Sequence, residues 1–99
     1  MSLLDRFGSG RPRAPLELVL YTRPGCHLCD EMKAVIAGAL RGVEHTLAEV
    51  DVDGDPELAR RHGLSIPVLA IDGRIAFKGR LTAAELLRKV SRPRSARGR

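Results

Sequence analysis

Two residues of this chain combine side chains and a spacing that suit covalent chemistry. Cys26 and Cys29 are its only cysteines, and they form a C-x-x-C motif. Two thiols at this spacing can form a disulfide with each other, and the same motif also provides half of the ligands of a zinc site. Residues 1–15 lack the apolar stretch of a secretory signal. A redox-active or metal-binding pair is therefore favoured over a structural cross-link.

The position of each cysteine predicts a different role for it. A Pro-Gly turn precedes Cys26, and apolar residues recur at helical spacing after it. At the start of a helix, unpaired backbone N–H groups and the positive end of the dipole stabilise a thiolate, so we expect the pKa of Cys26 to fall below that of an ordinary thiol. Cys29 lies one turn inside the helix and should be less exposed. Cys26 is then the nucleophile, and Cys29 resolves the mixed disulfide.

Metal binding is the alternative use of the same thiolates. A tetrahedral zinc site needs two further ligands, and His27, His45 and His62 have no ligand spacing among themselves. Asp30 follows Cys29, which excludes the C-x-x-C-H motif of haem attachment. We predict no resident metal, and a metal or iron–sulfur carrier stays open as the alternative to dithiol chemistry.

Apolar patterning predicts the elements that position this pair. Strands are expected over 16–21, 43–52, 66–71 and 74–78, and helices over 26–40, over 57–62 and from 82 onward. Asp72-Gly73 separates the last two strands and is typical of a hairpin, and Thr82 with Glu85 is spaced as a capping box. A strand–helix–strand unit makes the first two strands parallel. The sequence thus predicts an α/β fold, a four-stranded mixed sheet with three helices that cover both faces.

Two sequence motifs carry a family resemblance. Residues 18–32, which contain Gly25-Cys26-His27-Leu28-Cys29, and the segment Ser65-Ile66-Pro67-Val68 together resemble glutaredoxin-like proteins of the thioredoxin superfamily, in particular the small bacterial G-C-H-L-C group. The resemblance covers residues 16–92. It implies the thioredoxin-like fold, in the order β-α-β-α-β-β-α, and dithiol–disulfide exchange. It also implies that Pro67 is cis and faces the cysteines, so that Ile66 presents its backbone to a substrate.

Some residues depart from the patterns of the better-known relatives. Glutaredoxins that use glutathione usually carry Gly-Gly followed by acidic residues before the last helix, whereas residues 78–82 here contain one glycine and no acid. Thioredoxins carry W-C-G-P-C and a buried aspartate six residues before the first cysteine, where this chain has Leu20. We expect no bound cofactor. Glutathione and a reductase stay open as the source of electrons.

Three further side chains near the motif are candidates for the site. Tyr21 ends the first predicted strand and Arg23 lies in the turn after it, and both are predicted to contact substrate. Arg23 can pair with the thiolate or with a substrate carboxylate, and a solvated turn arginine is an equally good interpretation. A protonated His27 can stabilise the thiolate of Cys26, although an exposed histidine with little effect explains the sequence equally well.

Length and charge bound the remaining possibilities. Ninety-nine residues with 43% hydrophobic and 29% charged side chains are typical of one globular domain, and no apolar run is long enough to cross a membrane. The net charge of +5 comes from the two ends, because residues 14–87 hold more acidic than basic side chains. We expect a mobile segment over 1–15, the folded domain over 16–92 and a basic flexible tail over 93–99.

The partners expected from these features are disulfides. Phe7, Tyr21 and Phe77 are the only aromatic residues, so the chain offers no stacking platform for single-stranded nucleic acid. We expect a cytoplasmic monomer in electron transport, which reduces protein or small-molecule disulfides and binds no specific nucleic acid and no membrane. A binding module whose arginine-rich end docks an acidic partner or nucleic acid is the third interpretation.

Overall fold

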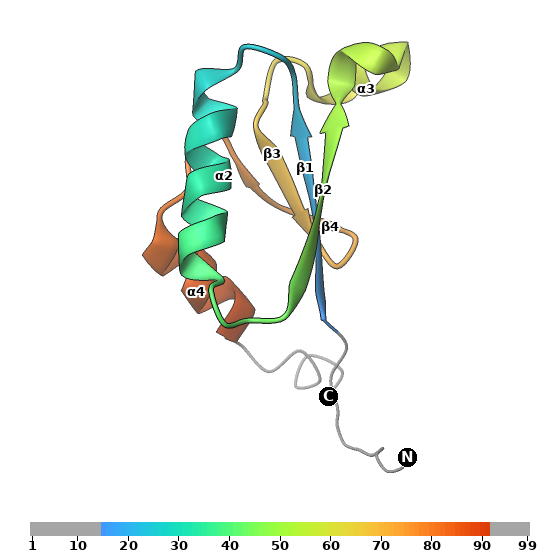
Figure 1. Ribbon diagram of the computed structural model, residues 1–99. Helices are drawn as coiled ribbons and strands as arrows, with labels where there is room; N and C mark the ends of the chain where they lie inside the picture. The colour runs from blue at the N-terminus through green and yellow to red at the C-terminus, as the bar shows by residue number, and fades with distance from the viewer. Residues whose placement is uncertain (1–14, 92–99) are drawn as a thin grey trace.

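The computed structural model of this chain describes residues 15–91 (Figure 1). Its strands are β1 (Leu16–Thr22), β2 (His45–Asp51), β3 (Val68–Ile71) and β4 (Arg74–Lys78). Its helices are α2 (His27–Ala39), α3 (Pro56–His62), α4 (Ala83–Ser91) and the short 3₁₀ helix η1 (Val52–Gly54). The segment predicted to be mobile, 1–15, falls almost entirely outside the described residues, and the predicted basic tail over 93–99 lies wholly outside them.

The strands form one mixed sheet in the order β2-β1-β3-β4. β1 is parallel to β2 and antiparallel to β3, and β3 is antiparallel to β4. The β3–β4 hairpin turns at Asp72 and Gly73, which both have positive φ, as a two-residue hairpin turn requires. The prediction of a four-stranded mixed α/β sheet with three helices is confirmed.

The core lies between one face of the sheet and the helices α2 and α4, which stand together on that side in Figure 1. Alternation along β1 directs Leu16, Leu18 and Leu20 into this core, with exposures of 5% or less. The next residue, Tyr21, points to the opposite face, where its ring lies 4.5 Å from that of His62 at the end of α3. Helices therefore contact both faces of the sheet, as predicted.

The ends of two strands differ from the prediction for reasons that the hydrogen bonds show. The strand predicted over 43–52 is shorter at both ends, because the N–H of Val43 bonds back to Leu40 in a turn and Val52 starts η1. The strand predicted from residue 66 begins at Val68. Pro67 has no N–H to donate, so the hydrogen-bond ladder ends beside it.

The helix ends follow local signals in the sequence. The N–H of Glu85 bonds to the Thr82 hydroxyl, and the N–H of Thr82 bonds to the Glu85 carboxylate, which is the predicted capping box at the start of α4. Asp55 caps α3 with Pro56 in its first turn. Within residues 15–91, every helix is too short or too polar to span a bilayer.

The core assignment can be tested on two neighbouring leucines of α4. Leu86 is fully buried, and Leu87 is 43% exposed. Leu86→Ala should lower the free energy of unfolding by about 2–5 kcal/mol, because it leaves a cavity in the core. Leu87→Ala is the matched control and should cost less than about 1 kcal/mol. Urea denaturation followed by circular dichroism measures both, and equal losses would contradict this packing.

Candidate functional site

Cys26 lies where β1 gives way to α2. The chain leaves β1 at Thr22 and turns through Gly25, whose φ of 79° favours glycine. The turn is closed by a hydrogen bond of 3.3 Å from the N–H of Cys26 to the carbonyl oxygen of Arg23. Cys26 then serves as the N-cap of α2, in an extended backbone conformation. The sequence prediction of a cysteine at the start of a helix is confirmed.

The sulfur of Cys26 acts as the capping atom of this helix. Its Sγ accepts a hydrogen bond of 3.1 Å from the backbone N–H of Cys29. An N-cap side chain normally accepts through oxygen, and here sulfur takes that place. The same N–H, together with the positive end of the dipole of α2, favours negative charge on sulfur. The structure holds the two cysteines as a disulfide, and the thiolate preference of a reduced Cys26 stays a prediction.

The two cysteines form a disulfide, with their Cα atoms 5.2 Å apart. Their side chains differ in access to solvent. Cys29 is 1% exposed and packs inside, whereas Cys26 is only partly buried. A partner molecule can therefore approach the sulfur of Cys26 more readily than that of Cys29.

Ile66 and Pro67 lie at the same end of the sheet as the cysteine turn. The last pair of the β1–β3 ladder is Tyr21 with Val68, so the residues just before Val68 run beside the exit of β1. The peptide bond between Ile66 and Pro67 is cis. Pro67 is fully buried, and its carbonyl oxygen accepts a hydrogen bond of 2.8 Å from Gly79. The backbone of this segment is thus fixed from the β4 side.

His27 and Arg80 share one carboxylate on the outer side of α2. Nε2 of His27 lies 3.1 Å from Glu31, and Nη1 of Arg80 lies 3.6 Å from the other oxygen of the same residue. The His27 side chain is 86% exposed. Its predicted effect on the Cys26 thiolate stays a prediction, and a protonated ring here has Glu31 as its partner.

The side chain of Arg23 donates three hydrogen bonds to other groups of the protein. Its guanidinium donates to both carboxylate oxygens of Asp53, at 3.0 and 3.1 Å, and to the carbonyl oxygen of Gly63 at 3.2 Å. The hydrogen bonds to Asp53 raise the pKa of Arg23, and Asp51 adds a smaller electrostatic contribution. Substrate contact by Arg23 and by Tyr21 stays a prediction. The ring of Tyr21 packs against His62.

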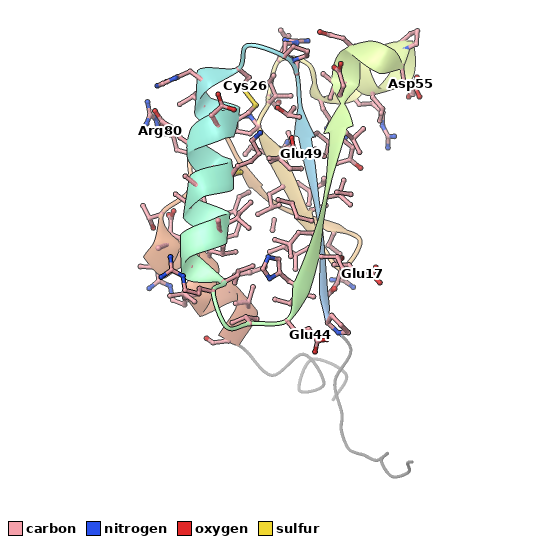
Figure 2. The ribbon with its side chains drawn as sticks, viewed as in Figure 1. Glu17, Cys26, Glu44, Glu49, Asp55 and Arg80 are labelled. Atoms are coloured by element: carbon pink, nitrogen blue, oxygen red, sulfur yellow. A yellow bond between two sulfur atoms is a disulfide. The ribbon has the colours of Figure 1, made fainter. Side chains whose placement is uncertain are left out.

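An ion pair connects α2 to β2, and sequence analysis did not find it. Lys33, one turn beyond Cys29, donates to Glu49 at 3.3 Å and lies 3.6 Å from Asp30. The hydrogen bond to Glu49 is the main cause of the raised pKa of Lys33. Glu49 is the neighbour of Leu20 across the β1–β2 ladder, and Figure 2 shows it on β2, next to the end of α2 that carries Cys26.

Asp53, Gly63 and Glu49 carried no signal of their own in the sequence. Asp53 follows a strand and Gly63 ends a helix, positions that such residues often occupy in any protein. Only the parallel register, which pairs Thr22 with Asp51, brings Asp53 near Arg23. The contact could have been predicted only from the register in which the two strands pair. Apolar patterning predicts the strands but not their register.

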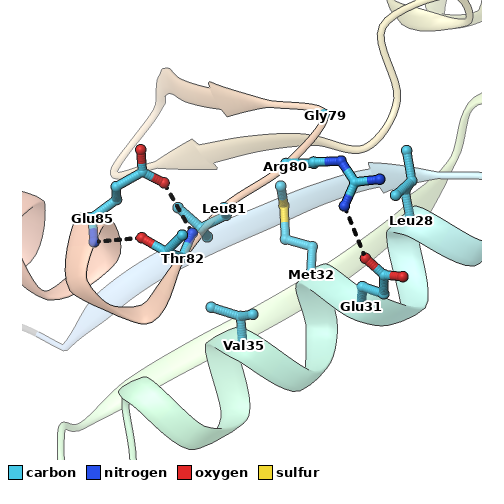
Figure 3. Close-up of a pocket in the computed structure, with 9 residues that line it drawn as sticks. All are labelled: Leu28, Glu31, Met32, Val35, Gly79, Arg80, Leu81, Thr82 and Glu85. Atoms are coloured by element: carbon cyan, nitrogen blue, oxygen red, sulfur yellow. Dashed lines mark hydrogen bonds and ion pairs between the residues drawn. The ribbon is translucent and has the colours of Figure 1, made fainter.

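A pocket of about 350 Å³ lies between α2 and the loop that leads into α4 (Figure 3). Its apolar lining comes from Leu28, Met32 and Val35 of α2 and from Leu81 of the loop. The ion pair between Glu31 and Arg80 lies at its rim, and the capping box of Thr82 and Glu85 forms another side. Among residues 15–91, no cluster of three or more histidine, cysteine, aspartate or glutamate side chains could hold a metal ion.

Comparison with models of protein families shows to which family this chain belongs. The model of the glutaredoxin-like domain (DUF836) matches residues 17–91 of this chain. The chain belongs to this family. The match includes both cysteines and the Ile66–Pro67 segment, so the predicted membership of the glutaredoxin-like branch of the thioredoxin superfamily is confirmed. No curated protein is similar enough to count as a match.

Solved structures show the same fold. A structural-genomics target from X. campestris is 32% identical, with a TM-score of 0.67 over 77% of this chain and 97% of its own. A protein from Nitrosomonas europaea is 28% identical, with a TM-score of 0.68 over 78% of this chain and 93% of its own. A mutant thioredoxin from Halobacterium salinarum is 21% identical, with a TM-score of 0.58 over 77% and 72%. The thioredoxin-like fold of this glutaredoxin-like protein is thereby confirmed.

The difference between the two sulfurs gives a direct test. At neutral pH, brief treatment of the reduced protein with iodoacetamide should alkylate Cys26 and leave Cys29 unmodified, because Cys29 is buried and Cys26 is the capping sulfur. Mass spectrometry of the digested protein gives the site. In urea, as a control, both cysteines should react. Preferential labelling of Cys29 in the folded protein would contradict this assignment.

Proposed function

We propose that this glutaredoxin-like protein is a thiol–disulfide oxidoreductase that reduces disulfides through Cys26 and Cys29. The observation that carries the proposal is the hydrogen bond from the N–H of Cys29 to the sulfur of Cys26, at the start of a 13-residue helix. This contact, with the greater exposure of Cys26, supports Cys26 as the nucleophile. The other sulfur is buried and within bonding reach.

The reaction transfers two electrons in two exchange steps. The thiolate of Cys26 attacks one sulfur of the substrate disulfide, forms a mixed disulfide and releases the first substrate thiolate. Cys29, after losing its proton, attacks the sulfur of Cys26 and releases the second substrate thiolate. The substrate is then reduced, and the protein holds the Cys26–Cys29 disulfide. This cycle needs no resident cofactor.

Substrate is proposed to bind across the end of the sheet that carries the cysteine turn. Ile66 and Pro67 lie at this end, beside the exit of β1. We propose that an extended substrate segment lies along the backbone of Ile66, with Tyr21 near its edge. His27 is proposed to favour the thiolate when its ring is protonated. These roles rest on position in the fold.

The electron donor and the setting belong to the same proposal. A protein or small-molecule disulfide is the substrate, and glutathione or a reductase regenerates the dithiol, which places the protein in electron transport. A dithiol reductant works in a reducing compartment, so the cytoplasm is the proposed location. The protein is proposed to act as a monomer, because the pair of sulfurs and the segment beside them come from one chain.

Replacement of the nucleophile tests the proposed activity. Cys26→Ser should abolish the reduction of insulin disulfides, because a serine hydroxyl does not attack a disulfide at neutral pH. Turbidity of the precipitating insulin chains, with dithiothreitol as the electron source, gives the rate. A Cys26→Ser protein that is as active as the unmodified protein would refute the proposal.

Replacement of the second cysteine should stop the reaction half-way. Cys29→Ser is expected to accumulate a mixed disulfide between Cys26 and the substrate, because nothing within the protein resolves it. Non-reducing electrophoresis and mass spectrometry detect the adduct, and dithiothreitol should release it. A Cys29→Ser protein that forms no adduct while Cys26 is reduced would contradict the order of attack.

A further inference from the structure

The hydrogen-bond ladder between β1 and β3 ends before it reaches the cysteine turn. Its last pair is Tyr21 with Val68. The residue before Val68 is Pro67, which has no N–H and so cannot donate the next bond of the ladder. Backbone pairing with β1 therefore stops where the Ile66 segment passes the turn that carries Cys26.

Beyond the end of this ladder, the side chain of Arg23 makes hydrogen bonds to two other segments of the chain. Its Nη1 donates to the carbonyl oxygen of Gly63 at 3.2 Å, forty residues away in sequence. Its Nε and Nη2 bind both carboxylate oxygens of Asp53. Such a paired contact fixes the plane of a guanidinium as well as its position, which a lysine cannot do. Three of the five N–H donors of Arg23 thus bind groups of this protein.

The backbone of Arg23 is fixed to the nucleophile. Its carbonyl oxygen accepts the hydrogen bond from the N–H of Cys26. One residue therefore contacts the cysteine turn through its main chain and two distant segments through its side chain. These segments are η1, which contains Asp53, and the C-cap of α3 at Gly63.

The backbone at Gly63 is closely packed on both the α3 side and the Arg23 side. The N–H of Gly63 bonds to Ala59 at 2.8 Å, and the N–H of Ser65 bonds to His62 at 2.8 Å. A Cβ atom at position 63 would lie 2.4 Å from the carbonyl oxygen of Ala59 and 3.2 Å from Nη2 of Arg23. The chain between α3 and Pro67 thus begins at a backbone position that Arg23 contacts closely.

We propose that Arg23 is a positioning residue, which with Asp53 holds residues 63–67 beside the Cys26 turn, and that it does not bind the substrate. The inference rests on the proposed reductase function and names what sets the distance between the nucleophile and the Ile66 segment. If residues 63–67 are misplaced, the substrate disulfide is held in a poorer position, and Cys26 attacks it more slowly although the Cys26 sulfur itself is unchanged.

The two possible roles of Arg23 predict opposite effects of Asp53→Asn. If Arg23 bound a substrate carboxylate, Asp53 would compete with the substrate, and Asp53→Asn would make reaction with carboxylate-bearing disulfides faster. If Arg23 is a positioning residue, Asp53→Asn weakens the same contact as Arg23→Met and slows every disulfide. Comparing the effect of Asp53→Asn on a charged and an uncharged disulfide therefore distinguishes the two roles.

The experiment measures the rate constant for oxidation of the reduced protein in a single turnover, by acid quenching and mass spectrometry. The two probes are hydroxyethyl disulfide, which is uncharged, and dithiodipropionate, which carries two carboxylates. Arg23→Met and Asp53→Asn should each lower both rate constants by about 10-fold, and the double variant should lose no more than either single variant. Arg23→Lys should fall between the unmodified protein and Arg23→Met.

Two controls separate position from charge and folding. Arg60→Met removes an arginine whose partner, Glu57, lies in the same helix, and it should leave both rate constants unchanged. The reduction potential of the Cys26–Cys29 pair should be the same in Arg23→Met as in the unmodified protein, because Asp53 already neutralises Arg23 and both sulfurs lie at the start of α2, as N-cap and in its first turn. A shift of the potential in Arg23→Met alone would overturn the proposal in favour of a direct charge effect.

Hydrogen exchange tests the contact without any activity. Arg23→Met and Asp53→Asn should speed amide exchange in residues 63–66 and leave β1 and β3 protected. Unchanged exchange in this segment, or a loss of rate for dithiodipropionate alone, would overturn the positioning role. An unmodified protein that reacts with neither disulfide would refute the proposed function instead, while the exchange result would still decide whether Arg23 holds the segment.

Discussion

The hydrogen bond from the N–H of Cys29 to the sulfur of Cys26 is the interaction on which the site depends. It exists because Cys26 occupies the cap of α2, where the helix leaves N–H groups without partners. The same geometry that completes the helix therefore distinguishes the two sulfurs. Cys26 holds the capping position and is partly accessible, and Cys29 is enclosed by the core. The start of α2 thus gives the two sulfurs different hydrogen bonding and different access to solvent.

The sheet brings this cap to its partner segment. β1 is a central strand, paired with β2 on one side and β3 on the other, and its inward leucines anchor it against α2 and α4. Because β1 is paired on both sides, the position of its last residues is fixed, and so is the start of the turn that follows. At that exit the ladder to β3 stops because Pro67 has no N–H, and contacts of the Arg23 side chain replace it. Backbone pairing between β1 and β3 therefore reaches only as far as Tyr21, and beyond it the Arg23 side chain contacts the chain that leads to Pro67.

Much of the fold could be predicted because its signals are local. The capping box of Thr82 and Glu85 and the Asp72-Gly73 turn involve residues that are close in sequence, so patterning alone identifies them. The ends of the second strand were predicted less accurately. A hydrogen bond from the N–H of Val43 to Leu40 and the 3₁₀ helix after β2 use backbone groups that would otherwise pair in the sheet. Patterning also gave no signal for the contact of Lys33 with Glu49, which depends on how α2 packs over β2.

The sequence by itself determined the candidate site: two thiols at C-x-x-C spacing, a turn and a helix that begins just after the first of them, and a proline segment that resembles a known family. These features are set by residues within a few positions of one another, where chain geometry leaves little choice. Only the tertiary structure decided that Arg23 pairs with Asp53 and Gly63, thirty and forty residues away. Contacts at such separations depend on strand register and helix packing. Local sequence patterns predict each segment but do not predict which distant segment it will contact.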